Sequence, residues 1–208
     1  MADALTMRGF HKALGEDRAG VLAVLQVALD LGLDPDELAV VIERESGWNP
    51  AAVNGKAQGL IQLRPIARRD IGMEADPVTL SRTEQAPWIK RFYQRVTEIA
   101  GGPIPPGDLY LSTFQPSAVG KPDSYVIAAP YTEKWENNAV WIRESPTGPI
   151  TAGSVRRAGS PRSDEGTWLS PRPEVAPAAS GLSLGTVLFL GGVGAAIWYW
   201  RQAWAGRP

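Results

Sequence analysis

Residues 34–50 read DPDELAVVIERESGWNP, and this stretch predicts an amphipathic helix that carries a carboxylate at the end of its apolar face. Leu38, Val41 and Ile42 stand at i, i+3 and i+4, which is the spacing of one helical face. Position i+7 of the same series is Glu45, so its side chain is expected to point toward the core rather than into water. Glu43 belongs to a different face and is expected to be solvated.

Both ends of this helix carry recognisable signals. Asp34 is a typical N-cap residue, Pro35 suits the first helical position, and Glu37 completes a capping-box pattern. Gly47, together with the proline that follows three residues later, predicts that the helix ends near Ser46. The glutamate at position 45 is therefore expected to lie in the last helical turn.

Two effects are expected to raise the pKa of Glu45. Burial disfavours a charged carboxylate, and so does the negative end of the helix dipole. A glutamate that stays protonated near neutral pH can donate its proton to a glycosidic oxygen as a general acid. The alternative interpretation is a glutamate whose carboxylate is hydrogen-bonded to a nearby backbone turn.

The residues around Glu45 extend the pattern. Residues 45–50 read ESGWNP, and residues 59–63 read GLIQL, followed by a proline at position 65. This order and spacing resemble the soluble lytic transglycosylase family, whose goose-type-lysozyme-like domain carries Glu-Ser, then Asn-Pro, then Gly-Leu-Met-Gln. The resemblance covers residues 41–65, with Ile61 where the family usually has methionine.

The resemblance implies roles for single residues. It implies that Glu45 is the one catalytic acid/base, that Ser46 and Gln62 border a glycan groove, and that Gly59 permits close backbone approach. Each of the last three also has a plainer interpretation, as a helix-end residue, a surface amide and a turn glycine respectively.

The third family motif, Ala-Tyr-Asn-Ala-Gly, is altered here. Residues 109–116 read LYLSTFQP, and the slot of the family tyrosine holds Ser112 or Thr113. This segment looks like the variant of some phage enzymes, in which an aromatic residue precedes a proline. Tyr110 and Phe114 are expected to form the groove wall, or alternatively to be core aromatics.

The activity that the resemblance implies is cleavage of the MurNAc-GlcNAc bond of peptidoglycan, with 1,6-anhydro-MurNAc ends as the product and without a cofactor or a metal. Ordinary glycosidases use two carboxylates. The best second candidates, Asp70 and Glu74, stand in no recognisable catalytic context. Two alternatives stay open, namely a lysozyme-type hydrolase that uses the same glutamate and a catalytically silent, membrane-anchored structural or wall-binding protein.

The rest of the globular region is also expected to be helical. Residues 21–29 follow a helical stripe, residues 84–100 predict a long helix with Pro87 in its first turn, and residues 107–114 and 132–143 predict shorter ones. The best strand signal is SYVIA at 124–128. We therefore expect a mainly α, lysozyme-like domain over residues 1–144.

Two segments of different composition follow this domain. Residues 145–180 are rich in Pro, Ser, Gly and Ala and are expected to form a disordered, flexible linker. Residues 181–201 are apolar, end in a Trp-Tyr-Trp-Arg sequence, and predict one C-terminal transmembrane helix, with a short tail at 202–208. Glycines at 181, 185, 191, 192 and 194 form a small-residue face that predicts contact with other virion or membrane proteins.

Composition excludes several kinds of chemistry. The formal net charge is −1, which argues against a nucleic-acid partner. The chain has no cysteine and a single histidine, His11, so thiolate sites and histidine metal clusters are excluded. No secretory signal is recognisable in residues 1–14, although the expected substrate lies outside the cytoplasm. Delivery on a virion, membrane-anchored and acting on the host periplasmic wall, resolves this. The alternative location is the bacterial inner membrane.

Overall fold

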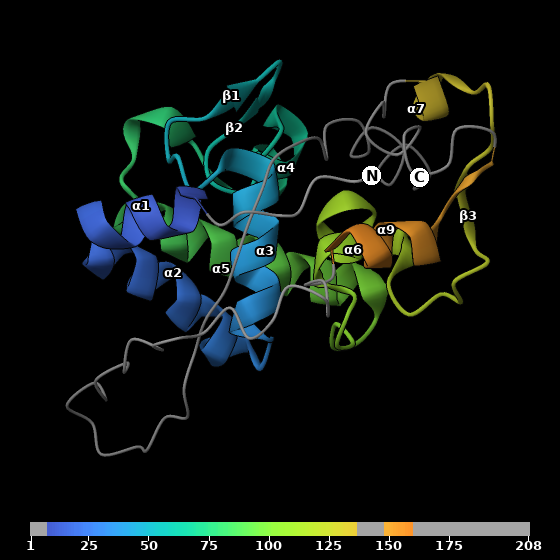
Figure 1. Cartoon of the computed structure of the whole chain (residues 1–208), viewed down its shortest axis with the longest axis horizontal. Helices are drawn as coiled ribbons and strands as arrows, with labels where there is room; N and C mark the ends of the chain where they lie inside the picture. The colour runs from blue at the N-terminus through green and yellow to red at the C-terminus, as the bar shows by residue number, and fades with distance from the viewer. Residues whose placement is uncertain (1–7, 137–147, 160–208) are drawn as a thin grey trace.

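The computed structural model describes residues 8–136 and 148–159 and is mainly helical there, as the sequence predicts (Figure 1). Four short strands form two antiparallel pairs, β1 with β2 and β3 with β4. In chain order the elements are α1 (Arg8–Glu16), α2 (Arg18–Leu31), α3 (Pro35–Ser46), β1 (Val53–Asn54), β2 (Ala57–Gln58), α4 (Pro65–Asp70), η1 (Pro77–Thr79), α5 (Arg82–Ala100), α6 (Leu109–Phe114), η2 (Pro116–Ala118), β3 (Val126–Ala128), α7 (Glu133–Glu136), β4 (Ile150–Thr151) and α9 (Ala152–Gly159).

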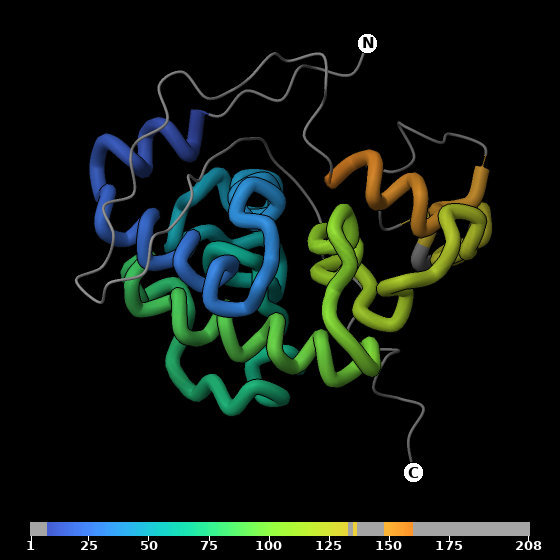
Figure 2. Tube along the Cα trace, turned by 90° about the horizontal axis from the view of Figure 1, so that it is seen from below, coloured from blue at the N-terminus to red at the C-terminus, as the bar shows by residue number. Residues whose placement is uncertain are grey.

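Helix α3 lies at the centre of the described fold. It packs against α2 and α6, while α2 packs along α5, so helices surround it (Figures 1 and 2). The run LAVVI at residues 38–42 is 0% exposed at every position. Five consecutive residues point to every side of a helix, so this part of α3 is covered on all sides. The position of α3 therefore places its last turn, and Glu45, inside the protein.

The predicted ends of α3 are largely confirmed. Its N-cap is Asp34, whose side chain accepts a hydrogen bond from Asp36 N at 2.8 Å. It ends at Ser46 because Gly47 adopts the left-handed conformation, with φ +56°. The predicted capping box is wrong: the Glu37 carboxylate turns away from the α3 N-terminus and accepts hydrogen bonds from two backbone N–H groups, of residues 107 and 109, at the start of α6.

Helix α5 begins two residues earlier than predicted. Ser81 caps it, and Ser81 and Glu84 form a reciprocal capping box. Pro87 is consequently the sixth helical residue rather than part of the first turn. The predicted short helices and strand are found as α6, α7 and β3, and the part of 132–143 beyond Glu136 lies outside the described residues.

A hairpin that the sequence analysis did not anticipate joins α3 to α4. Strands β1 and β2 pair antiparallel with Asn54 opposite Ala57, so Gly55 and Lys56 form a two-residue turn. Gln58 then forms a bridge with Leu63, which closes the loop of residues 59–62. The hairpin thus presents the GLIQ sequence as a closed loop beside the end of α3.

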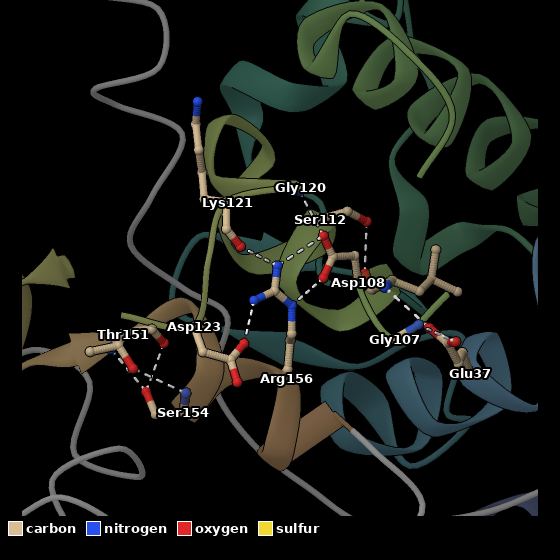
Figure 3. Close-up of polar contacts among 11 residues, drawn as sticks. Glu37, Gly107, Asp108, Ser112, Gly120, Lys121, Asp123, Thr151, Ser154 and Arg156 are labelled. Atoms are coloured by element: carbon tan, nitrogen blue, oxygen red, sulfur yellow. Dashed lines mark hydrogen bonds and ion pairs between the residues drawn. The ribbon is translucent and has the colours of Figure 1, made fainter. Parts of the chain in front are cut away.

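The boundary between domain and linker differs from the prediction. Residues 150–159, assigned by composition to a linker starting at 145, form β4 and α9, and α9 packs on α6. Ile150 and Val155 are 0% exposed. The Arg156 guanidinium binds both carboxylate oxygens of Asp108, and it also binds Asp123 at 2.6 Å and the carbonyl of residue 121 at 2.7 Å (Figure 3). Buried apolar side chains, pairing of β4 with β3 and the contacts of Arg156 together dock this short segment.

The remaining C-terminal predictions lie outside the described residues. These are the rest of the linker, the transmembrane helix at 181–201 and the tail at 202–208. Within residues 8–136 and 148–159, no helix combines the length and apolar character needed to cross a bilayer.

Candidate active site

The carboxyl of Glu45 is buried at the C-terminal end of α3. The residue is 7% exposed, and neither of its carboxylate oxygens contacts solvent. The next residue, Ser46, is half-buried and its hydroxyl donates to the backbone oxygen of Ile42 at 2.9 Å. The helix thus ends one residue after the glutamate, and the hydroxyl of Ser46 forms its hydrogen bond within the same helix.

The expectation that Glu43 is solvated is wrong. Glu43 is 2% exposed, and its two carboxylate oxygens accept hydrogen bonds from Gly9 N at 2.9 Å and from Phe10 N at 2.7 Å. These N–H groups belong to the first turn of α1, where helical N–H groups have no intrahelical partner. Burial raises the pKa of Glu43, and the two backbone hydrogen bonds oppose this. Glu43 is a structural carboxylate that fixes α1 on α3.

The loop of residues 59–62 lies against the segment that follows α3. The backbone N of Gly59 donates to the carbonyl of Ala52 at 2.9 Å, and the side-chain amide of Gln62 donates to the same carbonyl at 3.2 Å and to the carbonyl of Gly59 at 2.8 Å. Gln62 is 4% exposed, and its φ of +50° lies in the left-handed region. For a side chain other than glycine this conformation costs about 1–3 kcal/mol.

The oxygen of the Gln62 amide has a particular environment. Oε1 is buried and accepts no hydrogen bond from the described residues, whereas Nε2 donates two. A buried amide oxygen without a donor costs about 1–3 kcal/mol. The loop therefore carries both a left-handed backbone and an unsatisfied acceptor at one residue.

Gly59 allows close approach, but of the protein to itself. Its φ is +80°, and a Cβ atom there would lie 2.6 Å from Oε1 of Gln85 and 2.9 Å from Cβ of Pro77. Any larger residue would push the loop away from α5. The predicted requirement for glycine is thus explained by a contact with the scaffold.

A buried hydroxyl pair lies within the electrostatic reach of Glu45. Tyr93 on α5 is 0% exposed, and its hydroxyl is 2.9 Å from Oγ1 of Thr113 on α6. Thr113 donates to the carbonyl of Leu109, so the tyrosine donates to the threonine. Burial raises the pKa of Tyr93 above its usual 10.0, and the charges of Glu45 and Glu37 add to this rise. Sequence reasoning looked for the missing tyrosine only in the 109–116 segment and did not consider α5.

The two aromatic candidates are as buried as the core. Tyr110 is 3% exposed and Phe114 is 1% exposed. Both lie on α6, and the Arg44 guanidinium is 5.9 Å from the centre of the Tyr110 ring. Such low exposure is what the core alternative predicts for these two rings.

The second carboxylates considered from the sequence are not brought to Glu45. Asp70 is bound by Nε of Arg95 at 2.7 Å, and both line a cavity of about 390 Å³ between α4 and α5 whose lining does not include Glu45. Glu74 is exposed. Within the described part of the chain, no group of three or more His, Asp or Glu side chains is arranged to hold a metal ion.

Comparison with known protein families gives a match for this chain, over the segment that contains Glu45. Comparisons with curated proteins and with solved structures find no match. Residues 23–86 match the family model described as "Transglycosylase SLT domain". The matched segment contains Glu45, Ser46, Gly59 and Gln62 and ends before α6, so the altered third motif lies beyond it. This part of the chain is therefore similar to the transglycosylase SLT family.

Proposed function

We propose that the protein cleaves the MurNAc-GlcNAc bond of peptidoglycan with Glu45 as its single acid/base and leaves 1,6-anhydro-MurNAc ends. The observation that carries the proposal is the buried carboxyl at the last turn of α3, inside the segment that matches the transglycosylase family. Burial of this kind is what a general-acid glutamate needs, because it favours the protonated form.

The reaction needs one glutamate because the substrate supplies the nucleophile. Glu45 donates its proton to the oxygen that links MurNAc C1 to GlcNAc, and the C1–O bond breaks. The carboxylate then takes the proton of the MurNAc C6 hydroxyl, whose oxygen attacks C1 and closes the 1,6-anhydro ring. Glu45 ends protonated again, and no water is consumed. The two other carboxylates considered from the sequence do not favour a two-carboxylate mechanism, because Asp70 is bound by Arg95 and Glu74 is exposed.

Gln62 is proposed to bind the sugar. Its Oε1 is buried without a donor, and the N–H of an acetamido group would satisfy it. Both sugars of the peptidoglycan strand carry such a group. The hydroxyl of Ser46 already donates within α3, so a contact of the sugar through its Oγ would require that bond to break.

A virion-associated role that opens the host wall for genome entry is the proposed setting. Its support is the sequence alone: residues 109–116 resemble the variant of some phage enzymes, and residues 181–201 have the composition of a membrane anchor. Mass spectrometry of purified virus particles, searched for peptides of this chain, tests this setting directly. Detection of this chain only in bacterial membranes would contradict the virion setting and leave the enzymatic proposal untouched.

The activity is tested by digesting purified peptidoglycan with the parent and with Glu45→Gln. The amide keeps the size of the side chain but cannot transfer a proton, so turnover is expected to fall by about 10²–10⁴-fold or more. Glu74→Gln is the matched control, since it makes the same change at an exposed position and also removes a candidate second carboxylate.

The outcomes separate the mechanisms. Anhydro-ended products support transglycosylation, and reducing ends show hydrolysis. Parent-like digestion by Glu45→Gln would refute the assignment of the acid/base.

A further inference from the structure

Gln85, on α5, has no role in the mechanism above, yet its side chain is fully engaged. It is 4% exposed. Its Oε1 accepts a hydrogen bond from Leu60 N at 2.9 Å. Its Nε2 donates to the carbonyl of Pro50 at 2.8 Å and to the carbonyls of Pro77 and Leu80, each at 3.0 Å. Both polar atoms of this side chain are thus bonded to the backbone of other segments, so the residue acts as a bridge between them.

The bridged segments are the two that carry the candidate site. Pro50 ends the segment that runs on from Glu45 and Ser46, and Leu60 stands two residues before Gln62. The carbonyls of residues 77 and 80 belong to η1 and the turn before α5, and they hold the amide itself in place. One side chain on a rigid helix thus fixes the loop of Gln62 against the chain that leaves the glutamate.

Gly59 gives an independent sign of the same fit. A Cβ at this residue would lie 2.6 Å from Oε1 of Gln85, closer than real Cβ contacts allow. The loop and the amide are therefore matched in shape as well as in hydrogen bonding.

We propose that Gln85 is a positioning residue for the cleavage reaction: it sets where the Gln62 amide stands relative to the Glu45 carboxyl, without touching the glycan. The inference rests on the proposed function. Helix α3 holds Glu45 by itself, so loss of Gln85 releases the Gln62 loop and leaves the acid in place. A misplacement of about 1 Å costs on the order of 10²-fold in rate.

The test uses the full-length chain and soluble, uncrosslinked glycan strands as the substrate. Gln85→Met keeps the volume of the side chain and removes its four hydrogen bonds. We expect kcat to fall about 10- to 100-fold and KM to rise less, because the remaining groove contacts still bind the strand. Val155→Ala is the control, since it removes buried apolar volume on α9, away from both loops. All rates are measured at a temperature at which circular dichroism shows each variant folded.

Gln85→Glu adds a second measurement, the pH dependence of activity, which a change in stability alone would not alter. Its carboxylate keeps the acceptor for Leu60 N but faces three carbonyls with no proton to donate, whereas the protonated form donates to one of them. The activity of this variant relative to the parent should therefore rise as the pH falls, while the ratio for Gln85→Met stays flat.

The outcomes separate the two proposals. An active parent whose Gln85→Met variant cleaves as fast as Val155→Ala overturns the positioning role alone, and an inactive parent overturns the proposed function and this inference with it. If Gln85→Met fails to fold, the pH series decides, and a flat ratio for Gln85→Glu overturns the inference.

Discussion

The substitution Glu43→Gln should destabilise the protein without touching the reaction. In the parent, one carboxylate oxygen accepts from Gly9 N at 2.9 Å and the other from Phe10 N at 2.7 Å, with the residue 2% exposed. An amide has one oxygen, so its NH₂ group would face a backbone N–H. One buried donor is then left unsatisfied.

The magnitude follows from these two bonds. A buried polar group left without its partner costs about 1–3 kcal/mol. A domain of roughly 150 residues loses about 3 °C in Tm per kcal/mol, so a fall of about 3–9 °C is expected. Differential scanning calorimetry of Glu43→Gln beside Glu74→Gln, which is exposed and should unfold like the parent, measures it.

The cost should also depend on pH, with a defined sign. Burial raises the pKa of Glu43 above its usual 4.5. Between 4.5 and the raised value, the folded state binds more protons at this site than the unfolded state, so the parent loses stability as the pH rises through that window. The glutamine variant has no such titration. Its deficit should be largest at or below pH 4.5 and shrink above it. A deficit that grows with pH in urea unfolding, or an unchanged Tm, would refute this role for Glu43.

Two further predictions concern buried contacts of α5, α6 and α9. Gly159→Ala places a Cβ 2.1 Å from Cβ of Tyr110 and is expected to lower the stability measured in thermal unfolding by about 1–3 kcal/mol. The control is Gly15→Ala on α1, where the new Cβ has open space, and this variant should be neutral or slightly stabilising. Equal Tm values for the two variants would contradict the packing of α9. Tyr93→Phe should lose about 0.5–1.5 kcal/mol of stability, because the hydrogen bond to Thr113 is removed. Since the pKa of the Tyr93 phenol is raised, the folded parent and this variant should show the same amplitude of tyrosine ionisation around pH 10.0. A smaller amplitude in the variant would show that Tyr93 ionises with the other tyrosines.

The sequence was informative wherever the signal was local. The span of α3 follows from Asp34, Pro35 and Gly47, and the turn of the unanticipated hairpin stands in the sequence as Gly55-Lys56, a two-residue turn with glycine at its first position. The start of α5 was likewise available from Ser81 and the glutamate three residues later.

The errors arose where a partner comes from elsewhere in the chain. A single-face pattern on α3 assigns Glu43 to solvent, because nothing in residues 34–50 announces that the N-terminus of α1 will cover that face. The same reason explains the capping box predicted for Glu37 at the N-terminus of its own helix, because its actual donors are backbone N–H groups at the start of α6. The bridging role of Gln85 joins residues up to 35 positions apart, which no window of sequence contains.

The segment 150–159 was misjudged by composition, since low average hydrophobicity hides a few well-placed side chains. Ile150 and Val155 are fully buried, and Arg156 binds Asp108, so these side chains contribute to docking a segment whose average composition resembles a linker.

The docking of α9 also has a consequence for the order of events during synthesis. Asp108 must wait for Arg156, 48 residues further along the chain, before its carboxylate is neutralised, and Asp123 waits 33 residues for the same partner. Until then, α6 presents a buried-site carboxylate and the apolar ring of Tyr110 to water. Closing a loop of this length is slow compared with forming the local helices. We therefore expect a nascent chain to form its local helices first and to complete the packing around α6 only after residue 159 has been synthesised.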